Sequence, residues 1–296
     1  SFDGIVFETK IDSKNKAVHE ALSDKVTAAL RSIVAADAMF HEVYVKELSK
    51  QLAKEGSRAI DNAGNQAQDS VQHTEFSSVV HNFVRQMLLG LKAQSAADDA
   101  IAALKRGEKP IIAVENTMGS FLNEYAAANS VIQGGSLGSF DYRTVLSRAL
   151  ARTRVMTEQK ANGEKVKKTI PLSSLDGMTQ AAYAQAQDVI DGLDLDIPVS
   201  PIDWMRYQIQ KAGYSVSEIT GRALSVDYST PLKPTLSAIS AQEQNDKVQT
   251  TRLFNSGKLD ALILNVAGST GISLHASEKF ADKRQRHMIV AQPAQD

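Results

Sequence analysis

The stretch Leu259-Asp-Ala-Leu-Ile-Leu-Asn-Val-Ala-Gly-Ser-Thr-Gly-Ile-Ser-Leu-His275 decides the fold class of this chain. It opens with the continuous apolar run Ala261–Leu264, which suits a strand buried on both faces, as in a parallel sheet covered by helices. The small residues Ala267–Gly271 follow at once. Small residues suit a tight strand-to-helix turn whose backbone N–H groups approach a ligand. The stretch therefore predicts a loop at the carboxyl end of a sheet strand, the usual ligand-binding edge of an open α/β domain.

Strands and helices alternate on both sides of this stretch from residue 109 onward. We expect strands at Lys109–Asn116, Val216–Ile219 and His287–Ala291, with helices between them. This alternation predicts a mostly parallel sheet flanked by crossover helices. Thr117 is placed to cap the helix that follows the first of these strands. Residues 223–238 contain two prolines and three serines, which predicts a surface loop.

Several helix boundaries in this half of the chain carry recognisable capping residues. Asp141 is expected to cap a helix that runs to about Gln159, and Asn162-Gly163 reads as a turn between two short strands. Further helices are expected at 176–191, at 200–211 with the preferred order of cap and then proline, and at 240–254.

The first part of the chain has a different character. Residues 2–9 give a strand signal, and residues 10–108 have an almost wholly helical pattern, interrupted by the polar stretch Asp61–Ser70. We expect one helical region from Asn15 to about Ile60, a helix that opens near Thr74 and a third from Ala96 to Lys105. The prediction is therefore a strand and helical accessory region at 1–108, followed by an α/β lobe at 109–296.

The composition is that of an ordinary globular protein. The 296 residues carry a net charge of −1, so any nucleic-acid site must be a local patch. The absence of cysteine excludes disulfides and thiolate metal sites and fits a reducing cytoplasm. No apolar run is long enough to span a membrane, and the start lacks a signal-peptide pattern. Strand-like sequence at both ends suggests a piece of a longer protein.

Familiar catalytic motifs are missing from the sequence. The nearest approach to a Gly-x-x-x-x-Gly-Lys-Ser/Thr phosphate loop, Ser256-Gly-Lys258, lacks the upstream glycine and the hydroxyl residue. The six histidines show no metal-ligand spacing, whereas a zinc site needs three or four convergent ligands. Gly134-Gly135 and Gly138 suit a flexible loop better than a phosphate cradle. We therefore predict no catalytic residue and no metal site in this chain.

Four segments in fixed order carry a resemblance to a known family. Lys109–Phe121 resembles the motif IV strand and helix start of superfamily 2 helicases. Ser200–Met205 and Tyr214–Arg222 resemble the next helix and a strand that ends in a Thr-Gly-Arg turn. Gln249–Lys258 resembles the Arg…Phe-x-x-Gly helix before motif V, and Asn265–His275 resembles motif V.

Together these segments resemble the second RecA-like lobe of the strawberry-notch-like helicases, including the helicase–methyltransferase proteins of phages and plasmids. Gly271–Ala276 and the basic run Lys283–Arg286 are similar to features of that family, as is the opening Ser1–Phe7. The resemblance implies nucleic-acid contacts from Thr117, Thr220, Gly221, Arg222, Ser269 and Thr270, and an ATP-cleft role for Gly268, Gly271 and Ser273. Backbone N–H groups, hydroxyls and an arginine are suitable phosphate contacts that do not depend on base sequence.

The resemblance implies ATP and Mg²⁺ as cofactors only in the complete parent protein, because the first lobe and motif VI are missing. Nucleotide hydrolysis needs a phosphate cradle, a metal-holding carboxylate and positive charge at the transition state, and this chain supplies none of them. The implied parent is a cytoplasmic, bacterial or phage-encoded DNA translocase, linked to methylation or to defence against restriction. Its implied partners are DNA, the first RecA-like lobe and a methyltransferase domain, with no membrane.

Other interpretations stay open. Thr117 also suits a simple helix cap, Arg222 a surface salt bridge, and the small residues of motif V a close packing turn. The main rival function is a non-catalytic protein-interaction module, a helical scaffold with a degenerate α/β domain. A small-molecule site at Gly268–Gly271 is a third alternative that no acid, base or nucleophile supports. The helicase hypothesis predicts that Arg222 and Ser269–Gly271 converge on one edge of the sheet, whereas the rival predicts that they point away from any shared basic surface.

Overall fold

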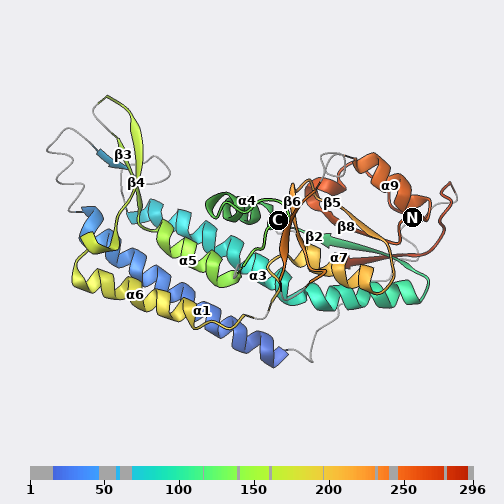
Figure 1. Cartoon of the computed structure of the whole chain (residues 1–296), viewed down its shortest axis with the longest axis horizontal. Helices are drawn as coiled ribbons and strands as arrows, with labels where there is room; N and C mark the ends of the chain where they lie inside the picture. Colours follow the sequence, from blue (N-terminus) through green and yellow to red (C-terminus); the bar gives the residue numbers. More distant parts are fainter. Residues whose placement is uncertain are drawn as a thin grey trace.

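The computed structural model describes residues 16–46, 58–60, 69–115, 117–138, 141–159, 162–195, 197–230, 233–239, 246–276 and 279–292. These residues form an α/β part built on a parallel sheet at one end of the long axis and a helical body at the other end (Figure 1). The fold class expected from the sequence, α/β with a mostly parallel sheet flanked by helices, is confirmed, and the arrangement is consistent with a RecA-like fold.

The main sheet has four parallel strands in the order β5-β8-β2-β9. Their bounds are Lys109–Val114 for β2, Val216–Ile219 for β5, Ala261–Asn265 for β8 and Arg286–Val290 for β9. The chain moves from β2 outward to β5 and then back to β8. Because crossover connections are right-handed, a reversal of direction requires the two connecting helices to lie on opposite faces of the sheet.

The two faces of the sheet are indeed covered by different helices. Ile112 and Ile263 pack with α3 (Asp69–Lys105) and α7 (Pro201–Lys211). Their strand neighbours Ile111, Leu262 and Leu264 pack on the opposite face with Phe254 of α9 (Lys247–Asn255). Successive residues of a strand point to opposite faces, so a strand covered on both sides has to be apolar at every position. This explains the continuous apolar run at 261–264.

The helical body combines segments from both halves of the chain. Its core joins α1 (Lys16–Phe40) to α4 (Gly119–Ala128), α5 (Tyr142–Arg152) and α6 (Gly177–Asp191). Edge-to-face aromatic pairs link these elements, with Phe40 against Tyr183 and Phe83 against Tyr142. The hydrophobic core of the body therefore crosses the boundary that the sequence suggested at residue 108.

A single long helix connects the two parts of the structure. The sequence suggested separate helices in this region, but α3 is continuous over 37 residues. Phe83 and Met87 belong to the core of the helical body, whereas Leu89, Ala97 and Ala100 belong to the core under the sheet. Packing on two cores in succession stabilises the helix through the stretch where the sequence pattern is weak.

Smaller elements complete the described structure. They are η1 (His41–Val45), β1 (Arg58–Ile60), β3 (Val155–Gln159), β4 (Lys165–Thr169), η2 (Leu172–Ser174), β6 (Leu224–Asp227), β7 (Thr235–Ala238) and α10 (Val266–Ser269). Strands β1, β3 and β4 form an antiparallel sheet, and β6 pairs with β7. No helix among the described residues has the length and apolar character needed to cross a membrane.

Several local expectations need correction. Residues 223–238 were expected to be a loop but contain the β6–β7 hairpin. The helix after Asp141 ends at Arg152, because residues 155–159 pair with β4. Ile60 lies in β1 and not in a helix. The expected strand at 2–9 and the start of the helix expected at 240–254 lie outside the described residues.

Gly90 provides a test of how the two parts meet. A Cβ atom on this residue of α3 would lie 2.9 Å from the Tyr142 hydroxyl and 3.4 Å from the Pro198 carbonyl oxygen. Alanine favours a helix by about 1 kcal/mol over glycine. We nevertheless expect Gly90→Ala to lower the free energy of unfolding by about 1–3 kcal/mol, because the buried tyrosine has to shift.

The controls are Tyr142→Phe and the double variant Gly90→Ala/Tyr142→Phe, and the free energy of unfolding of each is measured in urea. Tyr142→Phe removes the clashing oxygen together with its hydrogen bond to the Gln86 carbonyl (3.1 Å). We expect Gly90→Ala to be much less harmful in the Tyr142→Phe background than in the wild type. Equal losses in both backgrounds would contradict the steric explanation.

Candidate nucleic-acid interface

The segments expected to bind nucleic acid lie along one edge of the main sheet. Thr117 follows β2, Thr220 follows β5 and α10 follows β8, and these three strands are parallel neighbours. Asn265, the last residue of β8, ties two of the segments together. Its side-chain amide donates to the Thr220 carbonyl (3.2 Å), and its oxygen accepts from the Gly268 N–H (2.7 Å). The segments that follow β5 and β8 therefore meet at the carboxyl edge, but the predicted convergence also included Arg222, which turns away from this edge.

Gly268 has a packing role at this edge. A Cβ atom at this position would lie 2.0 Å from the backbone carbonyl oxygen of Ile219, closer than any real contact. The turn after β8 can approach the end of β5 only because residue 268 lacks a side chain. Its N–H is also used by Asn265. The close packing turn that the sequence left open as an alternative thus accounts for Gly268, and its N–H is not free for a phosphate.

The residues that follow Gly268 are more accessible. Thr270 and Ser273 are exposed, and Ser269 is half-buried. Gly271 is exposed with a φ of +74°, a left-handed conformation that favours glycine. The Ser273 hydroxyl lies 2.6 Å from His275 Nδ1, and its carbonyl accepts from the Asn255 amide at 3.0 Å. Thr270 and Gly271 present backbone and hydroxyl groups to solvent at the carboxyl edge, whereas Ser273 is bonded to the last turn of α9, toward the amino edge.

Thr117 does not cap its helix in the expected way. The N-cap position of α4 is Met118, which has a φ of +57° and makes no side-chain capping bond. The Thr117 hydroxyl accepts a long hydrogen bond from the Gly119 N–H at 3.4 Å. Thr117 is half-buried. It lies near the turn that contains Arg222, since a Cβ atom on Gly119 would lie 3.4 Å from both the Thr117 hydroxyl and Arg222 Cβ.

Arg222 is turned into the protein and away from the edge. Its side chain is only 1% exposed. The guanidinium donates to both carboxylate oxygens of Asp203 on α7 and to both oxygens of Glu218 on β5. This arrangement corrects the expectation of a phosphate contact, and it also differs from the surface salt bridge of the alternative interpretation. The sequence could not show the orientation, because the partners come from separate elements.

The network around Arg222 is fully connected. Asp203 also accepts from the Ser200 hydroxyl (2.5 Å) and from the Val226 N–H (2.7 Å), which ties α7 to β6. Burial alone would raise the pKa of Glu218, but hydrogen bonds and charges from Arg222 and Arg206 outweigh burial and lower the pKa to about 2. Burial alone would lower the pKa of Arg222, but the two carboxylates raise it above its ordinary value.

Two expected contacts flank this network at the surface. The Thr220 hydroxyl donates to Glu218 at 2.5 Å, so this half-buried side chain is held in place. Gly221 is exposed and has a φ of +70°, which lets the chain turn so that Arg222 points inward. The Thr-Gly-Arg turn therefore offers its backbone, not its arginine, to a ligand.

A positive charge that the sequence analysis missed lies at the same edge. Lys247, at the start of α9, donates from Nζ to the Thr270 carbonyl. Helix α9 runs from the carboxyl edge back toward the start of β8, so its first residue and its last turn lie at opposite edges of the sheet (Figure 1). The predicted helix at 240–254 contained Lys247, but its alignment with Thr270 depends on how α9 packs.

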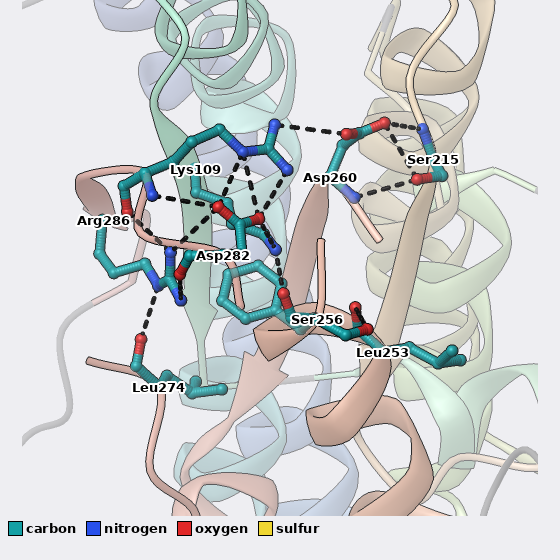
Figure 2. Close-up of polar contacts among 10 residues, drawn as sticks. Lys109, Ser215, Leu253, Ser256, Asp260, Leu274, Asp282 and Arg286 are labelled. Atoms are coloured by element: carbon teal, nitrogen blue, oxygen red, sulfur yellow. Dashed lines mark hydrogen bonds and ion pairs between the residues drawn. The ribbon is translucent and has the colours of Figure 1, made fainter. Parts of the chain in front are cut away.

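The basic run Lys283–Arg286 lies at the opposite, amino edge. Figure 2 shows Lys109, the first residue of β2, buried against Asp282, with Arg286 beside them. Arg284 also pairs with Asp282 (2.7 Å), and Arg286 donates to the Leu274 carbonyl (2.9 Å). Burial alone would raise the pKa of Asp282, but Arg284 and Lys109 hold it below its usual range. The two arginines are engaged in closing this edge.

The described residues contain no group of three or more histidine, aspartate or glutamate side chains placed to hold a metal ion. The carboxyl edge offers hydroxyls, turn backbone and one lysine. Such groups can bind a phosphate backbone but do not form a set for proton transfer or for Mg²⁺-assisted hydrolysis.

We expect Arg222→Met to lower the free energy of unfolding by about 3–5 kcal/mol, because it leaves buried Asp203 without a cation and buried Glu218 with only the more exposed Arg206. The matched control is Arg206→Met, which removes a more exposed arginine that contacts Glu218 at 2.8 Å. The control should cost about 1 kcal/mol or less. Similar losses for both variants in denaturant unfolding would contradict the central role of Arg222.

The lowered pKa of Glu218 predicts how the free energy of unfolding depends on pH. Its pKa in the folded state, about 2, lies below the ordinary 4.5, so its stabilising effect is complete above pH 4.5 and is lost as the pH falls toward 2. We expect the unfolding free energy of the wild type to fall more steeply between pH 4.5 and 3 than that of Glu218→Gln, by up to about 1.4 kcal/mol per pH unit. Unfolding free energies of the wild type and of Glu218→Gln that fall in parallel with pH would contradict this role of Glu218.

Comparison with known proteins adds no relative to this geometry. No protein-family model, curated protein or solved structure matches the chain.

Proposed function

We propose that this chain is the second RecA-like lobe of a strawberry-notch-like DNA helicase or translocase, and that its carboxyl edge contacts the nucleic-acid backbone. In the parent protein, ATP and Mg²⁺ would bind with the first lobe, and closure of the two lobes would move this edge along a strand. The chain alone would not hydrolyse ATP. The parent would act in the cytoplasm of a bacterium or of a phage-infected cell, and its link to methylation or restriction rests on the resemblance alone.

The observation that carries the proposal is the convergence of three separate segments on one edge. Thr117, the Thr220-Gly221 turn and Ser269–Gly271 come from positions far apart in the sequence, and the parallel strands bring their loops together. The carboxyl edge of a parallel sheet is where ligands of α/β proteins commonly bind.

The chemistry of this edge suits a phosphate backbone. Exposed Thr270 and Gly271 can donate hydrogen bonds without reading a base, and Lys247 adds a positive charge next to them. The ATP-cleft role of Gly268, Gly271 and Ser273 has weaker support. The Gly268 N–H is already bound, and the described residues provide no Mg²⁺ site. Nucleic-acid contact is therefore the role that we propose for this chain.

One observation favours the rival hypothesis of a protein-interaction module. Arg222 points inward, as the rival requires of that residue, and no basic surface is formed by it. Thr270 and Gly271, however, are exposed in the turn that follows β8. Nucleic-acid binding and its dependence on salt separate the two hypotheses, because only phosphate contacts release counterions.

Lys247→Gln tests the carboxyl edge most directly. With a single-stranded oligonucleotide of about 30 nucleotides, longer than a typical binding site, we expect the variant to bind about threefold to tenfold more weakly at low salt. The slope of log K against log salt concentration should become shallower by about 0.7, the value for one lost contact to a single strand. Fluorescence anisotropy across a salt series provides both quantities.

Lys258→Gln is the matched control. Lys258 is an exposed lysine beyond the other end of α9, at the amino edge of the sheet, so the same charge is removed on the wrong side. Its salt slope should equal that of the wild type. Equal effects of the two substitutions, or binding that Lys247→Gln leaves unchanged, would argue against the carboxyl edge as the interface.

A further inference from the structure

The antiparallel hairpin formed by β3 and β4 is a second basic feature, remote from the main sheet. Figure 1 shows it standing away from the far end of the helical body. Strand β4 carries Lys165, Lys167 and Lys168, all of them exposed, and we refer to these three residues as the lysine edge. Nothing in the carboxyl-edge interface accounts for them.

The lysine edge is open to a ligand. In the order β1-β3-β4, strand β4 is the outer strand of the described sheet. Lys165 lies opposite Gln159 and Lys167 opposite Thr157, so these two lysines lie on the same face of the hairpin. Two residues along a strand span about 6.8 Å. This distance is comparable with the spacing of successive phosphates in an extended single strand.

The base of the hairpin is fixed to the helical body. Met156 on β3 and Ile170 just after β4 are buried in its core. Arg154 clamps the same place, because its guanidinium donates to the Ile170 carbonyl (2.5 Å) and its own carbonyl accepts from the Ile170 N–H (2.9 Å). The lysine edge is thus held on a supported strand, which reduces the ordering cost of binding.

Charge is concentrated in this region of a nearly neutral chain. Residues 142–169 contain eight lysines and arginines but only two glutamates, against a net charge of −1 for the whole protein. Arg143 and Arg152 have acidic partners in Asp141 and Glu124. Within the described residues the three lysines of β4 form no ion pair. Their charge is therefore available to an external anion.

The geometry points to the lysine edge as a second nucleic-acid contact, which holds the phosphate backbone of a single strand independently of the carboxyl edge. Lysine is a point-like cation suited to backbone contact without base recognition. A membrane surface fits less well, because Asn162 and Glu164 near the turn are polar and the hairpin has no large exposed apolar side chain among its described residues.

Lysines also protect an outer strand from pairing with another chain, and the test has to separate that role from binding. The test variant is Lys165→Gln/Lys167→Gln/Lys168→Gln in the full chain. The control is Lys25→Gln/Lys105→Gln/Lys258→Gln, which removes the same charge from exposed lysines on α1, at the end of α3 and before β8. Single-stranded DNA and RNA of the same sequence serve as probes, with anionic phosphatidylserine vesicles as a separate arm.

We expect the hairpin variant to bind both nucleic acids at least tenfold more weakly at low salt. Its salt slope should be shallower by about 1.4, for the two lost contacts of Lys165 and Lys167, which lie on one face of the hairpin. The control triple should match the wild type, and thermal unfolding should show that all three proteins are folded. The effect should persist in the Lys247→Gln background, which separates this site from the carboxyl edge.

Four results would overturn the inference. These are no nucleic-acid binding by the wild type, an unchanged salt slope in the hairpin variant, an equal change in the control triple, and a loss confined to the vesicles. Self-association of the hairpin variant with an unchanged salt slope would assign the lysines to edge protection alone. A normal effect of Lys247→Gln beside an unchanged hairpin variant would overturn this inference and leave the carboxyl edge in place.

Discussion

The burial of one guanidinium organises the carboxyl half of the sheet. Arg222 can lie in the interior only because Asp203 and Glu218 neutralise it from two elements, one below the sheet and one within it. That requirement fixes the start of α7, the end of β5 and the first residues of β6 relative to one another. The surface turn at Thr220-Gly221 is then a consequence of an interior constraint, and the loops of the carboxyl edge are built on it.

The two edges of the sheet use charge in different ways. At the amino edge, Lys109, Arg284 and Arg286 surround Asp282, and the three cations are paired within the protein. At the carboxyl edge, the charges of Arg222, Asp203 and Glu218 are buried beneath the surface. Hydroxyls, turn backbone and Lys247 lie at the surface of this edge. A basic run in the sequence is therefore a poor guide to a binding face, because acidic partners elsewhere in the chain decide whether its charge is free.

The parts of the fold that the sequence predicted are those set by local patterns. The strand at 261–265 follows from its uniform apolar character, and the cap at Asp141 from its own side chain. The β6–β7 hairpin was missed because its strands are short and two prolines lie in the segment. The inward direction of Arg222 was missed because its partner Asp203 is 19 residues away. Convergence of the loops at one edge could be predicted, because parallel strands impose it.

The continuity of α3 gives the molecule a fixed internal length. A helix of 37 residues measures about 55 Å, and its two halves are packed into different cores. The core under the sheet holds one half, and the core that anchors the β3–β4 hairpin holds the other. Because α3 holds the carboxyl edge and the hairpin at a fixed separation, a nucleic-acid strand bound to both would always have the same number of nucleotides between the two contacts.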